Sequence, residues 1–191
     1  MERRTVRLGL VADTHMTPAS RGLPASLLAA LSGVDRILHA GDLVSLSVLG
    51  ELARIAPVVA VGGNCDPASV ARVLLERALW TIHGCTVGIQ HGHQPHALQD
   101  VYLGRGYDAP EFNVFCDTIA GQLRGADVIV FGHFHAPIVR RRGGLLFVSP
   151  GSVAPPHAAP TCALLEIQPD GTPAASIVDL GSSVCFAVPC E

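Results

Sequence analysis

The first third of the chain alternates between short apolar runs and segments in which apolar residues recur at helical spacing. Three of the runs have the length of buried strands, namely Val6–Ala12, Arg36–Ala40 and Pro57–Val61. Between them, the helical spacing of Pro24–Leu31 and Ser45–Ile55 predicts two helices. Strands that alternate with helices predict a parallel sheet with right-handed crossovers, and such sheets bind ligands beyond the carboxyl ends of their strands.

The second half of the chain carries pairs of apolar segments separated by turns that contain glycine. This pattern is typical of β-hairpins, and it predicts paired strands over Ala78–His83 with Thr86–Gln90, Pro137–Arg141 with Leu145–Ser149, and Thr161–Ile167 with Ala174–Leu180. A helix is expected over Glu111–Leu123 and a strand over Asp127–Phe131, whereas residues 92–109 have the pattern of a long loop. The expected fold class is therefore α/β, with two sheets packed together and helices outside them.

The length and composition favour a single domain over residues 1–191. The chain of 191 residues is 49% apolar and 15% charged, so it can bury a full core but is too short for two ordinary domains. The longest segment without a charged residue, Gly143–Leu165, contains four prolines and is not expected to span a membrane as a helix. The first apolar run ends at Asp13, short of a secretion signal, so a cytoplasmic location without a membrane anchor is expected.

Cysteine spacing and net charge argue against two further classes of protein. The six cysteines form no CxxC pair and are too sparse for a disulfide scaffold, so we expect thiols in a reducing compartment at Cys65, Cys85, Cys116, Cys162, Cys185 and Cys190. The net charge is −3 and the one basic cluster is Arg140–Arg142, so a dedicated nucleic-acid surface is not expected. A homo-oligomer stays open, because no sequence feature determines the number of subunits.

Polar clusters follow five of the predicted strands, at the point where each strand ends. They are Asp13-Thr14-His15, Gly41-Asp42, Gly63-Asn64-Cys65-Asp66, His91-Gly92-His93 and Gly132-His133-Phe134-His135. An aspartate and a histidine separated by one residue point broadly the same way, because side chains alternate along an extended chain. Carboxylate, imidazole and amide ligands without a thiolate cluster suit divalent Mn, Fe, Zn, Co or Ni. The clusters therefore predict a transition-metal centre.

In their order and residue types, these clusters resemble the motifs of the calcineurin-like metallophosphoesterases. The family motifs are D-x-H, G-D, G-N-H-[DE], an isolated His after a strand, and G-H-x-H, and the similarity covers about residues 6–152. Ser149-Pro150-Gly151-Ser152 resembles the family's closing N-P-G-S turn. The chain looks most like the compact prokaryotic phosphodiesterases of this superfamily, which are relatives of the eukaryotic retromer subunit. The resemblance implies a four-layer αββα sandwich of two mixed β-sheets flanked by helices, with the hairpin at 161–180 beyond the motifs.

The resemblance also implies a set of metal ligands and a reaction. It places Asp13, His15, Asp42 and His135 on one ion, and Asp42, Asn64, His91 and His133 on the other, so that Asp42 bridges. Two divalent ions, with Mn favoured over Ni, Fe, Co and Zn, would generate a bridging hydroxide that attacks phosphorus. The implied substrate is a small phosphoester, and Asp42 and Asn64 belong to the implied catalytic group.

One departure from the family motif concerns the leaving group. Relatives with G-N-H-[DE] use the histidine, oriented by the following acid, to help the leaving oxygen depart, and Cys65 and Asp66 occupy these positions here. A thiol lacks the reach and the second nitrogen of an imidazole. We therefore expect hydrolysis of phosphodiesters, because alkyl phosphomonoesters depend more strongly on a proton donor. His93 is the nearest alternative donor or substrate contact in the sequence.

Two other functions stay open at this stage. One is hydrolysis of phosphomonoesters such as nucleotides or small phosphorylated metabolites, because charge alone does not discriminate against them. The other is a non-catalytic scaffold on the same fold, although a scaffold has no physical reason to keep so many costly polar groups. Residues 94–110 form the longest insertion near the site and are expected to act as a lid or specificity loop. His39 is expected to be structural, and Arg140–Arg142 to face solvent.

Overall fold

The first sheet combines the strands of the N-terminal third with a C-terminal hairpin. The computed structural model describes residues 4–17, 19–20, 22–153 and 159–181. The five strands have the order β10-β9-β1-β2-β3, and they are β1 (Val6–Val11), β2 (Arg36–His39), β3 (Val58–Ala60), β9 (Thr161–Ile167) and β10 (Pro173–Asp179). Strands β1, β2 and β3 are parallel, as the alternation of strands and helices predicts, whereas β9 pairs antiparallel with β1.

The second sheet places a hairpin on each side of a central strand. Its five strands have the order β4-β5-β6-β8-β7, and they are β4 (Arg77–Ile82), β5 (Cys85–Gln90), β6 (Val128–Val130), β7 (Pro137–Arg142) and β8 (Leu145–Pro150). The inner strands β5, β6 and β8 are parallel, and the edge strands β4 and β7 are antiparallel to their neighbours. Both sheets are therefore mixed, as expected.

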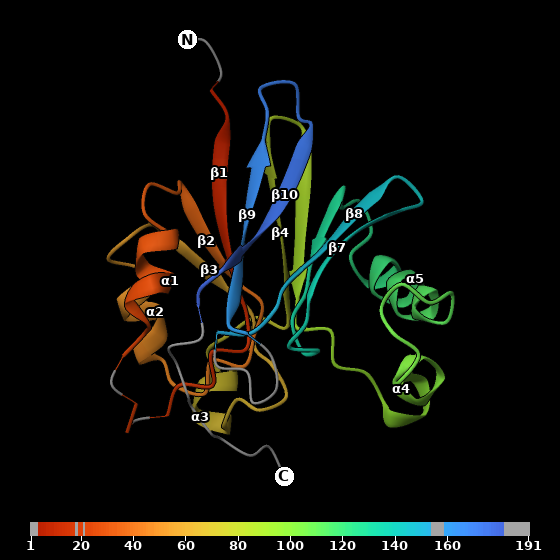
Figure 1. Cartoon of the computed structure of the whole chain (residues 1–191), viewed down its shortest axis with the longest axis horizontal. Helices are drawn as coiled ribbons and strands as arrows, with labels where there is room; N and C mark the ends of the chain where they lie inside the picture. Colours follow the sequence, from red (N-terminus) through yellow and green to blue (C-terminus); the bar gives the residue numbers. More distant parts are fainter. Residues whose placement is uncertain (1–3, 18, 21, 154–158, 182–191) are drawn as a thin grey trace.

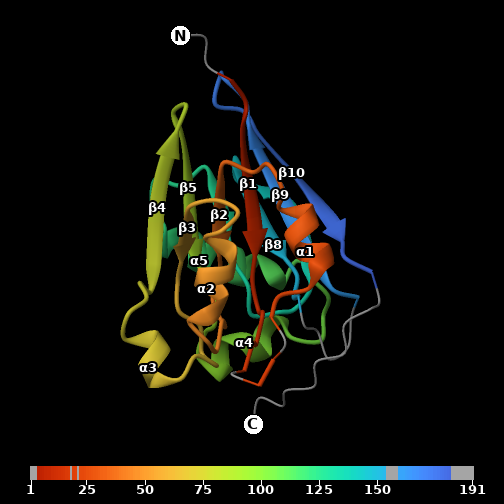
Figure 2. The same cartoon turned by 90° about the vertical axis from the view of Figure 1, so that its left-hand side faces the viewer.

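Helices cover the outer face of each sheet and complete four layers (Figures 1 and 2). Helices α1 (Ala25–Ala30) and α2 (Ser47–Leu52) pack on the first sheet, and α5 (Phe112–Gln122) packs on the second. A third apolar cluster lies between the sheets and includes Leu10 and Leu38 from one and Val87 and Val130 from the other. These three apolar layers confirm the expected four-layer αββα sandwich.

Helix α5 shows how the sequence pattern produces this packing. Phe112, Phe115, Cys116 and Ile119 recur at intervals of three and four residues, which places them on one face of a helix. All four are buried against the second sheet, where they contact the cluster that includes Phe131. The periodic apolar stripe therefore accounts for the position of this helix.

The segment 92–109 differs from the expected loop because it contains helix α4 (His96–Tyr102), so that prediction was wrong. The buried residues of α4 are Gln99 and Tyr102, whereas Leu98 and Val101 are exposed. Because the inward-facing side chains of α4 end in an amide and a phenol, the sequence of this segment lacks the apolar periodicity that predicts a helix. A shorter helix, α3 (Ala68–Ala71), was also not anticipated.

The basic cluster on β7 is less exposed than expected. Arg140 Nη1 donates a 2.8 Å hydrogen bond to the carbonyl oxygen of Tyr107, and Arg142 Nη2 lies 2.8 Å from Asp117 Oδ2 on α5. The arginines at both ends of the cluster thus attach β7 to α5 and the loop before it, while Arg141 is exposed.

The expectations about the cysteines and about membrane helices can be compared with the described residues alone. Cys185 and Cys190 lie outside the described residues. Among the helices of the described ranges, none combines the length and the apolar character that crossing a bilayer would require.

Candidate metal centre

The predicted metal ligands lie in loops that follow parallel strands, at one end of the sandwich. Five of them have a positive φ, between 46° and 75°, and these are Asp13, His15, Asp42, His133 and His135. In residues other than glycine this backbone conformation is uncommon and persists only where the surrounding structure enforces it. The loops therefore hold these side chains in a strained arrangement, which is the usual setting of a functional site.

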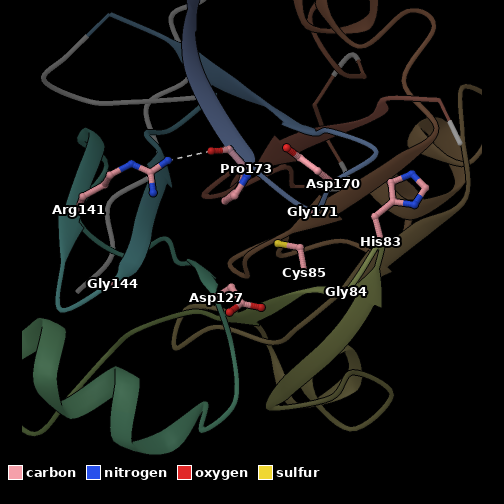
Figure 3. Close-up of a pocket in the computed structure, with 9 residues that line it drawn as sticks. All are labelled: His83, Gly84, Cys85, Asp127, Arg141, Gly144, Asp170, Gly171 and Pro173. Atoms are coloured by element: carbon pink, nitrogen blue, oxygen red, sulfur yellow. Dashed lines mark hydrogen bonds between the residues drawn. The ribbon is translucent and has the colours of Figure 1, made fainter.

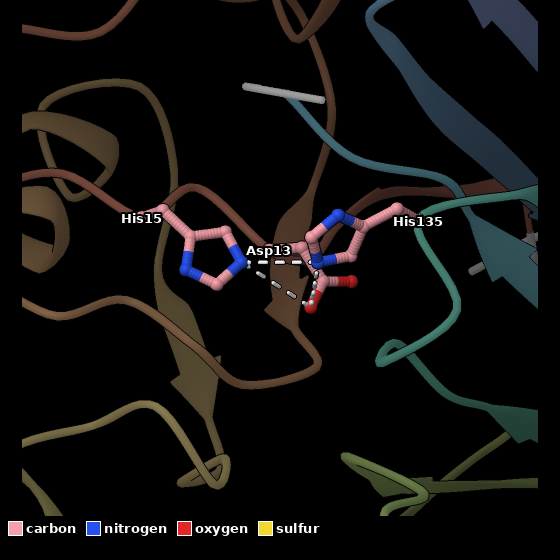
Figure 4. A group of neighbouring side chains, drawn as sticks. All are labelled: Asp13, His15 and His135. Carbon is pink, nitrogen blue, oxygen red and sulfur yellow. Dashed lines mark hydrogen bonds and ion pairs between the residues drawn. The ribbon is translucent and has the colours of Figure 1, made fainter. Parts of the chain in front are cut away.

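One group of donor atoms comes from Asp13, His15 and His135 (Figure 4). The Nε2 atoms of the two histidines are 3.1 Å apart. Asp13 Oδ1 lies 3.9 Å from Nε2 of His15 and 3.5 Å from Nε2 of His135. Asp42 Oδ2 lies 3.9 Å from the same nitrogen of His15, so a second carboxylate faces the group.

A second group of donor atoms comes from Asp42, Asn64, His91 and His133. Asp42 Oδ2 lies 3.2 Å from His91 Nε2, and Asn64 Oδ1 lies 3.0 Å from both His91 Nε2 and His133 Nδ1. His91 Nδ1 donates a 2.8 Å hydrogen bond to the carbonyl oxygen of Ala40. That bond keeps a proton on Nδ1, so Nε2 is the ring nitrogen that can give up its proton and bind a cation. The structure therefore brings all seven predicted ligands together, with Asp42 between the two groups.

Backbone N–H groups hold both carboxylates in place. The N–H of His133 donates to Asp13 Oδ2 at 3.0 Å, and the N–H of Cys65 donates to Asp42 Oδ1 at 2.8 Å. Gly63 lies so close to Asp42 that a Cβ atom there would come within 2.1 Å of Oδ1. Glycine at this position lets the loop after β3 close around the carboxylate, while Oδ2 stays directed at the histidines.

The electrostatics of the site are dominated by two buried carboxylates. In the described part of the chain, the ion pairs of Asp13 and Asp42 are with histidines alone. Burial raises the pKa of Asp42, but its hydrogen bond and charge interaction with His91 outweigh burial and hold that pKa below its usual range. Burial lowers the pKa of His91, but Asp42 and Asp13 overcome this effect and raise it to about 9. Burial, followed by the charge of His91, lowers the pKa of His133 to about 4.

This donor set fits divalent cations. Donor atoms of Asp13, His15 and His135 lie within 4.8 Å of one another, as do those of Asp13, Asp42 and His91. Metal bonds of about 2.0 to 2.2 Å to nitrogen and oxygen can connect atoms at such separations after small side-chain shifts. Buried carboxylates need compensating positive charge, and a cation between these groups would supply it. Carboxylate, imidazole and amide donors suit the transition metals predicted from the sequence.

Two residues near the centre support its loops. The Asp66 carboxylate accepts hydrogen bonds from the N–H groups of Val44, at 2.6 Å, and Gly63, at 2.8 Å. It therefore ties the loop after β2 to the loop after β3. His39 is fully buried, and its Nε2 lies 3.1 Å from the hydroxyl of Thr14. The structural role expected for His39 agrees with this contact.

The two candidates for the leaving-group acid lie at different distances from the donor groups. Cys65 Sγ belongs to a group with His15 and Asp42 whose donor atoms lie within 4.8 Å of one another. The exposed ring of His93 is centred 5.6 Å from the His91 ring and 6.4 Å from the His133 ring. Cys65 is therefore part of the centre, whereas His93 stands at its rim.

Gln99 is a site residue that the sequence analysis missed. Its Nε2 donates a 2.6 Å hydrogen bond to the carbonyl oxygen of Gln94 and lies 3.2 Å from His133 Nε2. The hydroxyl of Tyr102 donates to Gln94 Oε1 at 3.2 Å, so the inward face of α4 forms one connected network. Through Gln99, helix α4 contacts the ring nitrogen of His133 that faces away from Asn64. No motif marks this residue, and only the fold brings it to the centre.

Replacing Gln99 should weaken metal binding without unfolding the protein. Gln99→Leu removes a polar contact that orients His133, and losses of this kind typically reduce metal affinity by about ten- to a hundredfold. Calorimetric titration of the metal-stripped protein with Mn²⁺ measures the effect. Leu98→Gln, on the exposed face of the same helix, is the matched control and should bind Mn²⁺ like the native chain. Equal affinities for all three proteins would show that Gln99 does not support the centre.

A cavity of about 320 Å³, separate from the metal centre, lies at the opposite end of the sandwich, where three hairpin turns meet (Figure 3). Its polar groups are engaged in the fold, since Arg141 Nη2 donates to the carbonyl oxygen of Pro173 and Asp127 accepts the N–H of Thr86. Burial, followed by the charge of Asp127, raises the pKa of Cys85 to about 11. A thiol with that pKa stays protonated near neutral pH and is a poor nucleophile. The metal centre is therefore the stronger candidate for chemistry.

Comparisons with known sequences agree with the geometry of the centre. Residues 6–170 match the family model described as the calcineurin-like phosphoesterase superfamily domain. A probable metallophosphoesterase of Methanothermobacter thermautotrophicus is 33% identical over 179 residues, which cover 93% of this chain and 95% of that protein. A second one, from Methanocaldococcus jannaschii, is 30% identical over 164 residues, which cover 86% of this chain and 74% of that protein.

Comparisons with solved structures support the fold. Vacuolar protein sorting 29 from Cryptosporidium parvum aligns with a TM-score of 0.70 at 21% identity, over 93% of this chain and 98% of that one. A protein from Streptococcus pneumoniae, described as a predicted phosphoesterase, aligns with a TM-score of 0.63 at 21% identity, over 93% of this chain and 91% of that one. At these identities the likeness establishes the shared sandwich and nothing further.

Proposed function

The chain belongs to the calcineurin-like phosphoesterase superfamily, and from this premise we propose that it is a phosphodiesterase with a two-ion centre. Membership of the family supports metal-dependent hydrolysis of phosphoesters. The observation that carries the two-ion proposal is the position of Asp42, whose Oδ2 lies 3.9 Å from His15 Nε2 and 3.2 Å from His91 Nε2. One carboxylate oxygen that faces two groups of donors is the arrangement that a bridging ligand requires.

In this proposal, the seven side chains hold the ions in two sets that share Asp42. The first set is Asp13, His15, Asp42 and His135, and the second is Asp42, Asn64, His91 and His133. Bound there, a pair of divalent cations lowers the pKa of water and offsets the charge of the phosphoryl oxygens. The nitrogen and oxygen donors of these side chains suit Mn²⁺, with Ni, Fe, Co and Zn as alternatives.

The contribution of the chain itself is to hold the donors in a fixed geometry. The carbonyl oxygen of Ala40 accepts the Nδ1–H of His91 and so directs Nε2 at the centre, and the N–H of Cys65 holds the carboxylate of Asp42. Gln99 contacts the outer nitrogen of His133. Because these supporting groups belong to backbone or to a packed helix, the donors are positioned before a substrate arrives.

A cavity of about 540 Å³ opens beside the second set of donors. Asn64 and His133 line both the cavity and the centre, and Gln99 from α4 contributes a wall. Asp, Glu, Lys and Arg are absent from the residues that line this cavity within the described chain. A cavity of this size, lined by amide, imidazole and proline side chains, can receive a neutral organic group of the substrate, while the phosphoryl group lies at the ions. We propose residues 94–110, which include α4, as the specificity element.

The preference for diesters follows from the residue at position 65. In the resembling enzymes a histidine at this position helps the leaving oxygen depart, and Cys65 lacks the reach of that imidazole. An activated aryl diester expels its leaving group without such help, whereas an alkyl monoester needs a proton donor. The chain is therefore better suited to diesters, with His93 at the rim as a substrate contact.

An aryl diester paired with an aryl and an alkyl monoester tests this preference. Metal-stripped protein reloaded with Mn²⁺ should hydrolyse bis(p-nitrophenyl) phosphate faster than p-nitrophenyl phosphate, and an alkyl monoester such as glycerol 2-phosphate most slowly of the three, because its leaving group needs a proton donor. Cys65→Ala should change turnover of the diester by less than about tenfold, or roughly 1.4 kcal/mol of barrier. Cys65→His should raise hydrolysis of the monoesters, provided that Asp66 orients the new imidazole. Monoesterase activity above diesterase activity in the native protein would favour the rival hypothesis, in which the substrate is a nucleotide or a small phosphorylated metabolite.

The same assay decides whether the chain is a scaffold. The vacuolar protein sorting 29 structures share the fold, so a role in protein assembly is the non-enzymatic alternative. The buried carboxylates and histidines favour catalysis over that role, because burying them is costly for a purely structural protein. Failure to hydrolyse any of these esters with Mn²⁺, Ni²⁺ or Zn²⁺ bound would support the scaffold.

A further inference from the structure

The sulfur atom of Cys65 lies among the donor atoms of the metal centre. Its Sγ, a ring nitrogen of His15 and a carboxylate oxygen of Asp42 lie within 4.8 Å of one another. We propose that Cys65 binds, as a thiolate, the ion that His15 and Asp42 hold, so that the centre has a sulfur ligand beside nitrogen and oxygen. This inference rests on the proposed metal centre and goes beyond it, because the residue in the resembling motif is a leaving-group acid rather than a ligand.

The loop that carries Cys65 is fixed relative to Asp42. The N–H of Cys65 donates to Asp42 Oδ1 at 2.8 Å, which anchors the cysteine to the carboxylate that would share its ion. Asp66 binds the N–H groups of Gly63 and Val44 and so holds the loop against the one after β2. With the backbone held at both sides, the sulfur has one side-chain rotation with which to reach the ion.

The geometry and the local bonding suit a sulfur ligand. Zinc bonds of about 2.3 Å to sulfur and about 2.0 to 2.1 Å to nitrogen place two ligand atoms of one ion roughly 3.5 Å apart in a tetrahedral site. A group of atoms within 4.8 Å needs only a small rotation to reach that spacing. Asn64 Nδ2 also donates to Cys65 Sγ at 3.4 Å, so the sulfur accepts a hydrogen bond, as an electron-rich ligand atom would.

The other described cysteines lie in different surroundings. Cys85, Cys116 and Cys162 are buried in the three apolar clusters of the sandwich. Burial raises the pKa of Cys162 to about 12. Within the described residues, Cys65 is the one cysteine that shares a group of possible ligand atoms with histidine and aspartate.

A thiolate ligand has two chemical consequences. Sulfur is a soft donor, so it shifts the preference of the centre from Mn²⁺ toward Zn²⁺ and Co²⁺. A thiolate bound to an ion carries no proton, so it cannot protonate a leaving alkoxide. The diester preference proposed above then has a direct cause at Cys65 itself.

Cobalt absorption provides the test. Full-length native protein, stripped of metal and kept reduced with a phosphine, is titrated with Co²⁺ and its spectrum recorded. The native chain should show a thiolate-to-cobalt charge-transfer band in the near ultraviolet together with the visible bands of bound Co²⁺. Cys65→Ala should lose the charge-transfer band and keep the visible bands of bound Co²⁺. Cys85→Ala, the same change at the far end of the sandwich, is the matched control and should keep both.

Competition between metals gives a second readout. The preference for Zn²⁺ over Mn²⁺ should fall by at least about tenfold in Cys65→Ala, since loss of even a supporting contact at a metal site costs that much. X-ray absorption of the zinc-loaded native protein needs no variant and should show a sulfur neighbour at about 2.3 Å. A zinc coordination shell that contains nitrogen and oxygen but no sulfur would overturn the proposal.

The outcomes separate this inference from the proposed function. Visible cobalt bands without a charge-transfer band in the native chain would reject the sulfur ligand and leave the metal centre standing. A charge-transfer band that persists in Cys65→Ala would assign the sulfur to another cysteine and would also reject the proposal. No binding of Co²⁺ at all would overturn both this inference and the metal centre.

Discussion

We expect Asp42→Asn to lower kcat/KM for an aryl phosphodiester by at least about a thousandfold, which corresponds to about 4 kcal/mol of activation free energy. The reason is that Asp42 Oδ2 faces His15 in one group of donors and His91 in the other. The amide keeps the shape of the side chain and can still accept the N–H of Cys65, so the fold should persist. It removes the negative charge on which both ions would depend. The kcat/KM of the metal-reloaded protein, with its metal content, measures the effect.

His15→Ala is the comparison that isolates the shared position of Asp42. His15 contacts the first group of donors alone, so its loss should leave the second ion bound and should reduce kcat/KM by less than Asp42→Asn does. Thermal unfolding of both variants in the metal-free state checks that neither result reflects a misfolded chain. A larger loss for His15→Ala would mean that Asp42 is not the bridging ligand.

Gly63→Ala should remove most of the activity by adding a single methyl group. A Cβ atom at this position would lie 2.1 Å from Asp42 Oδ1 and 2.6 Å from the backbone nitrogen of Asp42, far inside contact distance. Either the loop after β3 moves away or the carboxylate rotates, and both displace Asp42 Oδ2 from the histidines. Overpacking of this kind costs about 1 to 3 kcal/mol of stability. We expect a loss of at least about a hundredfold in kcat/KM and weaker binding of Mn²⁺.

Gly62→Ala is a closely matched control for that variant. A Cβ atom added to this neighbouring glycine would have Leu74 Cβ as its nearest contact, at 3.7 Å, which is an ordinary van der Waals distance. Neither glycine has a positive φ, so the two substitutions differ in local space and not in backbone strain. Activity assays and calorimetric titration with Mn²⁺ should therefore find Gly62→Ala near the native values. Native activity in Gly63→Ala would show that the Asp42 carboxylate tolerates displacement.

The elements that the sequence predicts well are those whose burial is apolar and periodic. β1, β2 and α5 were expected within two residues of their observed bounds, because their inward positions are occupied by aliphatic or aromatic side chains. The donor clusters were found for a related reason, since each follows an apolar run that has the length of a strand. Parallel strands bring such positions to one end of a sheet, so order along the chain translates into proximity.

The features that the sequence does not reveal depend on contacts between segments distant in the chain. Gln99 reaches His133 only because α4 packs beside the loop after β6. The carboxylate of Asp66 accepts the N–H groups of Val44 and Gly63. Both contacts are between amide or carboxylate groups and partners that no local pattern specifies. Polar contacts of this kind have no periodicity, so the folded arrangement is needed to find them.

The two groups of donors are drawn from both halves of the sandwich. Asp13 and Asp42 follow strands of the first sheet, whereas His91 and His133 follow strands of the second. Cations held between them would join the sheets at one end, where the apolar layer between the sheets stops. Folding and metal uptake would then form a single linked equilibrium, in which ligand at a hundred times its dissociation constant adds about 2.7 kcal/mol per independent site. The lifetime of the folded chain against proteolysis would thereby depend on the supply of metal around it.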